Sequence, residues 1–404
     1  MSEREPQPTL TVASRLSGYL RGGGIITPLL TALIAFFIGG LVVALTGSNP
    51  FTTYKAIFDG TGLNWLLPWT SSDDRIIAAQ NLQQTLIITT PLILTGLAVG
   101  LAFRAGLFNI GGNGQYIVGM IAAVFVGTRL GGLPGVLHIV LAVVAAMAAG
   151  GAWAALAGWL RSATGANEVI STIMLNWIAL WIGVYLFGLG GPLQGSQPSV
   201  PVSADIFHSA RLPVFWGDPE LQGLHIGIFL ALAAAGLVWV LLNRSVPGYE
   251  IKAVGFNPDA AEYGGINPGR QQVKAMAICG LLAGLAGAMD ILGWQFRLAT
   301  NDIQISQIGF LGIAVALLGR NTALGTVIAA LLFGALVNGT SVRNLDPEVF
   351  RPDLATNLTT IIQGLVVLFV SGDVLVVVLW RLRGRLPRRP GDAPAAPAPA
   401  ETAT

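Results

Sequence analysis

The sequence predicts an all-α polytopic membrane protein with about ten transmembrane helices, including broken or re-entrant segments. Composition is the first reason. Hydrophobic residues make up 53% of the 404 residues and charged residues only 10%, whereas soluble domains carry about 25% charged residues. Patterning is the second, because ten apolar segments approach the roughly 20 residues that cross a bilayer as a helix.

The predicted spans lie, in chain order, at residues 25–46, 85–103, 114–130, 135–160, 169–188, 223–243, 273–294, 308–319, 324–340 and 357–381. The first is too long for a signal peptide and lacks a small-residue cleavage site, so we read it as a retained anchor. The third and eighth are short and glycine-rich. These spans form one transmembrane domain, residues 25–382, between an N-terminal segment, 1–24, and a Pro- and Ala-rich tail, 383–404, which we expect to be disordered.

The basic residues predict the orientation of these spans. If both termini are cytoplasmic, 15 of the 22 Lys and Arg residues lie inside. Cytoplasmic loops carry an excess of Lys and Arg, so this arrangement is favoured and places the polar stretch 243–274 in the cytoplasm. The single cysteine, Cys279, cannot form a disulfide within the chain, and the three histidines have no metal-ligand spacing. We therefore predict no catalytic residue, metal or cofactor in this chain.

A glycine-rich interruption is predicted between the second and third spans. The stretch from Arg104 to Gly119, RAGLFNIGGNGQYIVG, contains five glycines and two asparagines, and Gly309 to Gly325 is interrupted in the same way. Non-helical backbone at membrane depth is tolerated where it is buried in protein or lines a polar cavity, and paired interruptions in two halves indicate a transport pathway. The alternative is that the glycines only allow close helix packing, as we expect for Gly280, Gly284 and Gly287.

Six residues are candidates for lining this pathway: Asn109, Asn113, Gln115, Glu168, Asn176 and Trp177. The amides offer uncharged hydrogen-bonding groups for hydroxyls or base edges. Trp177 could stack on a base or sugar, although packing against helices or lipid is the more common role. Glu168 follows Asn167 at the start of a span, which favours an interfacial helix start over a proton relay. Asp290 is expected near a span end, within reach of water.

The polar stretch 243–274 has the pattern of a short capped helix. Asn257 is a suitable N-cap, Pro258 fits the first helical position, and Asp259 adds negative charge where the helix dipole favours it. Gly264 and Gly265 are expected to end this helix in the left-handed conformation. No Gly-Lys pair, which a Walker A loop requires, occurs in the chain. If ATP drives the protein, a separate ATPase must bind it, and this stretch is the predicted docking site.

Four segments resemble the permease subunits of bacterial ABC importers, most closely the simple-sugar and nucleoside group that is related to ribose and branched-chain amino-acid permeases. They are FNIGGNGQYIVG (108–119), ANEVISTIMLNWIA (166–179), AVGFNPDAAEYGGIN (253–267) and GFLGIAVALLGRNTALGTVIAALLFGAL (309–336). The resemblance covers most of residues 85–340. One departure is Gly112-Asn113, where many relatives carry Ala-Glu, so an acidic role at this site is in doubt.

The resemblance implies a bacterial inner-membrane protein with three kinds of partner. These are an ATPase that binds ATP and Mg, a second homologous permease subunit, and an extracytoplasmic substrate-binding protein. It also identifies the coupling segment, with Gly255, Asn257, Asp259, Ala260, Ala261 and Gly264 as its core. A solvated surface loop is the alternative for this segment.

The expected substrate is a neutral, hydroxylated solute, because charged residues are scarce in the spans. A nucleoside is the first choice, and a ribose-like sugar is the second. A stand-alone channel or secondary carrier is an alternative of another class, and a non-transporting scaffold subunit is a third.

Overall fold

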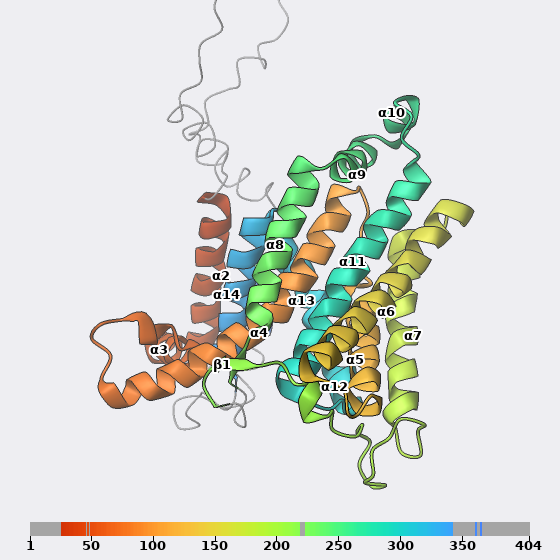
Figure 1. Ribbon diagram of the computed structural model, residues 1–404. Coiled ribbons are helices and arrows are strands. Elements are labelled where there is room, and N and C mark those ends of the chain that lie inside the picture. The colour runs from red at the N-terminus through yellow and green to blue at the C-terminus, as the bar shows by residue number, and fades with distance from the viewer. Residues whose placement is uncertain are drawn as a thin grey trace, which may run out of the picture.

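The computed structural model describes residues 26–45, 47, 49–218, 223–341, 360–361 and 364–365, with side chains from residue 33 onward. Helices dominate this part of the chain, which confirms the predicted all-α class (Figure 1). Six of the described helices are long and apolar enough to cross a membrane, and two further apolar helices, Leu33–Leu45 and Ala323–Gly339, are shorter. The tenth predicted span, 357–381, lies almost entirely outside the described residues, as do the segments 1–24 and 383–404.

The described elements follow one another as α2 (Ile26–Leu45), α3 (Pro50–Thr61), η1 (Leu63–Leu66), α4 (Ser72–Arg104), α5 (Gly112–Arg129), α6 (Gly135–Thr164), α7 (Glu168–Phe187), η2 (His208–Ala210), β1 (Val214–Trp216), β2 (Leu224–His225), α8 (Gly227–Arg244), α9 (Val246–Phe256), α10 (Pro258–Tyr263), α11 (Pro268–Asp290), η4 (Ile291–Gln295), α12 (Thr300–Ile305), α13 (Ile308–Leu318) and α14 (Ala323–Gly339). Strands β1 and β2 form an antiparallel pair in which Val214 faces His225 and Trp216 faces Leu224.

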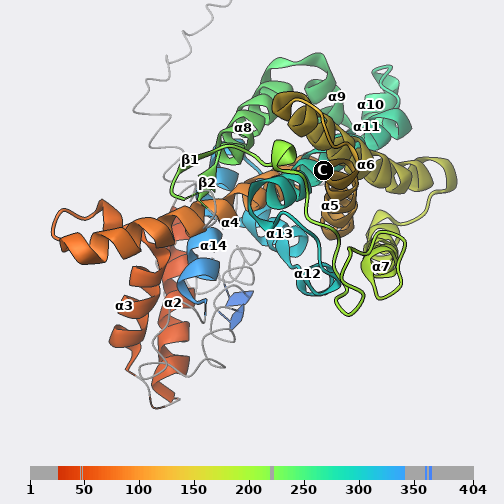
Figure 2. The same ribbon diagram turned by 60° about the horizontal axis from the view of Figure 1, so that its bottom comes forward.

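Helices α4 and α11 form the centre of the bundle. In each, 83% of the most apolar window is buried, against 28–33% in α6, α7 and α8. Figure 2 shows α4 between α2, α3 and α14 on one side and α5, α6 and α11 on the other. The outer helices α6, α7 and α8 expose large apolar side chains such as Trp159, Trp181 and Leu237, which suits contact with lipid.

Glycines allow α5, α6 and α11 to approach closely. A Cβ atom at Gly280 would lie 2.1 Å from the Gly150 carbonyl oxygen, and one at Gly284 would lie 2.2 Å from that of Ala146. On the α5 side, a Cβ at Gly287 would lie 2.5 Å from the Tyr116 carbonyl oxygen. The predicted packing role of Gly280, Gly284 and Gly287 is therefore confirmed. Small residues at such crossings let helix backbones meet inside a membrane.

The main departure from the predicted spans is α4. It begins at Ser72, thirteen residues before the predicted start at 85, and is 33 residues long. A helix of that length measures about 50 Å at 1.5 Å per residue, more than the ~30 Å hydrocarbon core. Helix α4 therefore extends well beyond the apolar layer at its N-terminal end, next to α3 (Figure 1).

The two ends of the bundle carry different structures. Helices α9 and α10 project from one end, between α8 and α11, at the top of Figure 1. At the other end lie α3, β1, α12 and the loop after α7. We call the first the inner end, following the predicted orientation, and the second the outer end.

Candidate transport and coupling sites

The predicted interruption is present between α4 and α5. Helix α4 ends at Arg104 and α5 begins at Gly112, and Gly106 has a left-handed φ of 70°. Asn109 in this break and Gln115 in the first turn of α5 are both 1% exposed and pair with each other. The Asn109 Nδ2 donates to Gln115 Oε1 at 3.2 Å, and the Gln115 Nε2 donates to Asn109 Oδ1 at 3.0 Å. The two amides therefore satisfy each other inside the chain.

Asn176 of α7 fastens the break to the neighbouring helix. Its Oδ1 accepts the Gly114 N–H at 2.7 Å, and its Nδ2 donates to the Ile110 carbonyl at 2.9 Å. The first N–H groups of a helix have no partner within that helix, so a side chain that accepts one of them stabilises the helix start. Asn176, which is 7% exposed, performs this function for α5 from outside it.

Asn113 joins the two interrupted segments. Its Oδ1 accepts the backbone N–H of Gly309, at the start of α13, at 3.2 Å. A Cβ atom at Gly309 would lie 2.2 Å from both Cα and N of Asn113, so the two backbones are in direct contact. The two predicted interruptions, separated by almost 200 residues, thus meet in space. The contact needs a glycine at position 309, because any larger residue would place its Cβ against the Asn113 backbone.

Glu168 and Trp177 lie apart from this amide cluster. Glu168 is the first residue of α7 and forms an ion pair with Arg161, while Asn167 caps the helix by accepting the Val169 N–H at 2.9 Å. This position confirms a helix-start placement for Glu168. Trp177 follows Asn176 in the sequence, but 56% of its surface is exposed, whereas Asn176 is 7% exposed. The pathway role of all six candidates stays a prediction.

Asp290, by contrast, is not within reach of water as predicted. It is 3% exposed, and its carboxylate accepts hydrogen bonds from the Tyr116 hydroxyl and from the Trp294 Nε1, the latter at 3.0 Å. The partners come from α5 and η4 and could not be recognised from sequence spacing. Among the described residues, no group of three His, Cys, Asp or Glu side chains is placed to hold a metal.

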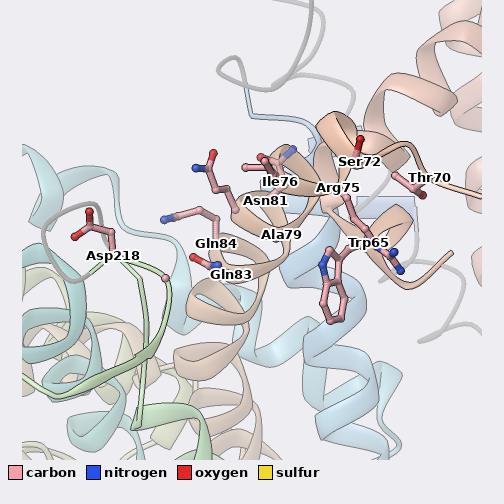
Figure 3. Close-up of a pocket in the computed structure, with 12 residues that line it drawn as sticks. Trp65, Thr70, Ser72, Arg75, Ile76, Ala79, Asn81, Gln83, Gln84 and Asp218 are labelled. Carbon is pink, nitrogen blue, oxygen red and sulfur yellow. The ribbon is translucent and has the colours of Figure 1, made fainter. Parts of the chain in front are cut away.

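An outer cavity of about 910 Å³ lies against the extended part of α4, and sequence reasoning missed it (Figure 3). Four amide side chains of α4 line it, Gln80, Asn81, Gln83 and Gln84, together with Trp65 of η1 and Arg75. The Trp65 ring packs on Trp216 of β1 with centroids 5.3 Å apart. Amides and an aromatic face are the groups that recognise uncharged polar solutes.

At the inner end, α9 and α10 form the element that we call the coupling island, residues 246–263. The Asn257 Oδ1 accepts the Ala260 N–H at 3.1 Å, which confirms the predicted N-cap. Gly264 ends α10, but its φ is −78°, so the predicted left-handed conformation is wrong for this residue. Gly265 adopts it instead, with φ of 80°, and the Ile266 N–H then reaches the Ala261 carbonyl at 3.0 Å.

The coupling island exposes large apolar side chains at the inner end of the bundle, beyond the long apolar helices. Tyr263 is 96% exposed and Phe256 is 86% exposed, and Asp259 and Ala260 are exposed beside them. Ala261 is only 5% exposed and packs within the chain. Exposed apolar groups gathered on a projecting element are typical of surfaces that contact another protein or a membrane.

Gly255 connects the coupling island to the break. A Cβ atom at Gly255 would lie 2.2 Å from the Arg104 carbonyl oxygen, and one at Gly106 would lie 3.0 Å from Gly255 Cα. Backbone therefore meets backbone where α9 crosses the end of α4. No side chain separates the two backbones at this crossing, and close-packed contacts of this kind transmit strain.

Comparison with known proteins gives a consistent result. Residues 81–371 match the family model described as the permease component of branched-chain amino acid transport systems. The chain is 37% identical to the guanosine ABC transporter permease protein NupP of Bacillus subtilis, over 87% of this chain and 94% of that protein. It is 29% identical to the nucleoside ABC transporter permease protein NupB of Lactococcus lactis, over 88% and 93% of the two chains.

A sugar permease is also similar. The glucose ABC transporter permease protein TsgB13 of Haloferax volcanii is 34% identical over 91% of this chain and 92% of its own length. No solved structure matches the chain.

Proposed function

The chain belongs to the family of permease components of branched-chain amino acid transport systems, and from this premise we propose that it imports a nucleoside as one membrane subunit of an ATP-driven complex. The observation that carries the proposal is the coupling island, which is exposed on one side and packed on the break through Gly255 on the other. This arrangement suits a subunit that receives movement from an ATPase and passes it to the membrane helices.

The proposed complex has four parts. An ATPase with bound ATP and Mg docks on the coupling island, and Asp259, Ala260 and Tyr263 are the exposed groups that it meets. A second homologous permease subunit completes the translocation path, and an extracytoplasmic binding protein delivers the solute to the outer end. The complex lies in a bacterial inner membrane with both termini of this chain in the cytoplasm.

In the proposed mechanism, ATP-driven closure of the ATPase displaces α9 and α10. Gly255 transmits the displacement to Arg104 and Gly106 at the start of the break. The break is fastened to α7 through Asn176 and to α13 through Asn113, so these helices move with it. The outer and inner ends of the path then open in alternation.

A nucleoside is the preferred solute for two reasons. The relatives named above transport guanosine and nucleosides according to their names. The outer cavity offers four amides and an indole ring, and its charged lining residues, Arg75 and Asp218, are of opposite sign. A ribose-like sugar is the second candidate, because the Haloferax relative is named as a glucose permease. Asn109 and Gln115 pair with each other in this conformation, so a solute would contact them only after the break rearranges.

Uptake into vesicles that hold the full complex tests the proposal. We expect ATP-dependent accumulation of labelled guanosine, competed by other nucleosides and not by ribose or glucose. Sugar-only uptake would replace the first candidate with the second. Solute movement by the purified chain without an ATPase would favour a stand-alone carrier, and unchanged uptake after deletion of the chain would favour a scaffold.

A further inference from the structure

A small basic pocket lies at the inner end, between α4, α9 and the turn that joins α13 to α14. Its volume is about 230 Å³, and three cationic side chains line it: Arg104, Lys252 and Arg320. Each comes from a different element, and none of the described lining residues is acidic. We propose that this pocket binds the phosphate of an anionic phospholipid headgroup.

Contacts within the pocket hold Arg104 in place. Its Nε donates to the Asn321 carbonyl at 3.1 Å, and its Nη2 lies 3.5 Å from the Arg320 carbonyl. The turn itself has an uncommon shape, because Arg320 and Asn321 both have φ of 53° although neither is glycine. The end of α4 and the α13–α14 turn are thus joined before any ligand binds, which gives the pocket two fixed walls.

Charge and position favour an anion from the membrane. Three cationic side chains line one pocket, and each of them attracts an anion bound there. The pocket lies where α4 and α13 end, and we infer that these helix ends lie near the lipid headgroups because both helices belong to apolar candidate spans. Basic pockets between membrane helices on the cytoplasmic side bind anionic headgroups for this reason.

Size and apolar walls favour a headgroup over a larger soluble ligand. Pockets for drug-sized molecules have volumes of about 300–1,000 Å³, so 230 Å³ suits a phosphodiester better than a nucleotide. Phe103 and Phe256 also line the pocket, and Phe256 is 86% exposed. Apolar rings at the mouth can contact the glycerol and the first methylene groups of a lipid.

The occupant would bridge the coupling island and the break. Lys252 and Gly255 belong to α9, whereas Arg104 ends α4 immediately before the break. A bound phosphate therefore ties α9 to α4 at the crossing where Gly255 meets the Arg104 carbonyl. The consequence, that anionic lipid strengthens coupling, rests on the proposed function. Binding itself does not depend on it.

Native mass spectrometry of the purified full chain tests the proposal, with phosphatidylglycerol as the probe and phosphatidylcholine as the neutral comparison. The double variant Lys252→Gln/Arg320→Gln removes two of the cations and leaves Arg104 and its hydrogen bonds intact. We expect phosphatidylglycerol to bind about 25-fold more weakly to this variant, about fivefold for each cation. Its thermal unfolding in detergent shows that the variant is folded.

The matched control is Arg270→Gln/Lys274→Gln, which removes two exposed cations from the first turns of α11, outside the pocket. We expect this variant to bind phosphatidylglycerol as tightly as the unmodified chain does. Equal weakening in both variants, or equal binding of the two lipids by the unmodified chain, would overturn the proposal.

Competition with inorganic phosphate distinguishes a lipid headgroup from a free anion as the occupant of the pocket. Inorganic phosphate at millimolar concentration is expected to leave bound phosphatidylglycerol in place, because it lacks the glycerol and acyl contacts. Displacement by phosphate alone would assign the pocket to a soluble anion instead. The assay contains neither ATPase nor nucleoside, so a failure here is separate from a failure of the proposed transport function.

Discussion

The break at 105–111 and the coupling island at 246–263 touch at Gly255, yet they differ in the exposure of their polar groups. In and around the break, Asn109, Gln115 and Asn176 are buried, and each is hydrogen-bonded within the chain. In the island, Asp259 and Tyr263 are exposed. A buried polar group that finds its partner inside the chain stabilises that chain, whereas exposed groups on a projecting helix are available to another molecule.

This difference separates two roles that the sequence alone could not distinguish. The buried amides hold an irregular backbone in one conformation, so their replacement should first reduce stability. Residues such as Ile251 and Ala261 bury the inner side of the island, whereas Asp259 and Ala260 are exposed, so replacement of these exposed residues should first reduce coupling. Variants in the two regions can therefore test whether these two roles are separate.

The largest expected effect comes from Gly309→Ala. The added Cβ would lie 2.2 Å from backbone atoms of Asn113, and no side-chain rotation relieves that clash. We expect the free energy of unfolding to fall by about 3 kcal/mol, as in other overpacked interiors. Thermal or denaturant unfolding of the purified chain in detergent measures it.

The matched control is Gly236→Ala in α8, where a Cβ would meet nothing within 4 Å. Alanine is the better helix former by about 1 kcal/mol, so this variant should be no less stable than the unmodified chain. If Gly309→Ala proves as stable as Gly236→Ala, the contact between the interrupted segments is not needed for stability.

The next effect distinguishes two neighbours on α7. Asn176→Leu leaves the Gly114 N–H and the Ile110 carbonyl without partners, which should cost about 2 kcal/mol of stability. Trp177→Leu alters a side chain that is 56% exposed, and we expect a change within ~0.5 kcal/mol. The same unfolding measurement compares them, and uptake assays accompany it. A changed solute preference in Trp177→Leu would restore this residue to the pathway.

A smaller effect is expected for Glu168→Gln. The variant loses the ion pair with Arg161, whose side chain is 34% exposed, so the cost should be about 1 kcal/mol. Lys55→Gln, which removes the more exposed pair with Asp59, should cost less than about 0.5 kcal/mol. Unfolding at low and high salt measures both. A larger effect for Lys55→Gln would contradict the burial argument.

Local patterns in the sequence predicted much of this fold. Apolar length located most of the spans, and the Asn257-Pro258 pair predicted the start of α10 because capping depends on neighbouring residues. The long extension of α4 was missed, since Gln80 to Gln84 lower the hydropathy without preventing a helix. Polar residues can continue a membrane helix once it leaves the apolar layer, and hydropathy does not register this.

The candidate sites were less predictable, because their partners are distant in the sequence. Glycines in both interruptions were recognised, but the Asn113–Gly309 hydrogen bond arises only when α5 and α13 pack together. Asp290 was expected near water because the sequence does not reveal its contacts with Tyr116 and Trp294. Likewise, Ala260 and Ala261 are adjacent in sequence, and only the fold shows that Ala261 faces inward.

The most direct test of the central claim measures coupling through the island in a complex reconstituted with its ATPase and binding protein. The double variant Asp259→Trp/Ala260→Trp places bulk on the exposed surface of α10, and Leu237→Trp, at a site that is 70% exposed on α8, is the control. The measured quantity is labelled guanosine accumulated per ATP hydrolysed.

We predict that the island variant unfolds at the same temperature as the unmodified chain, because substitutions at exposed sites change stability by only about 0.5 kcal/mol. Its guanosine uptake per ATP should nevertheless fall at least tenfold, while the α8 control keeps its coupling. Unchanged uptake per ATP in the island variant would contradict the assignment of α9 and α10 as the element that links ATP hydrolysis to the membrane helices.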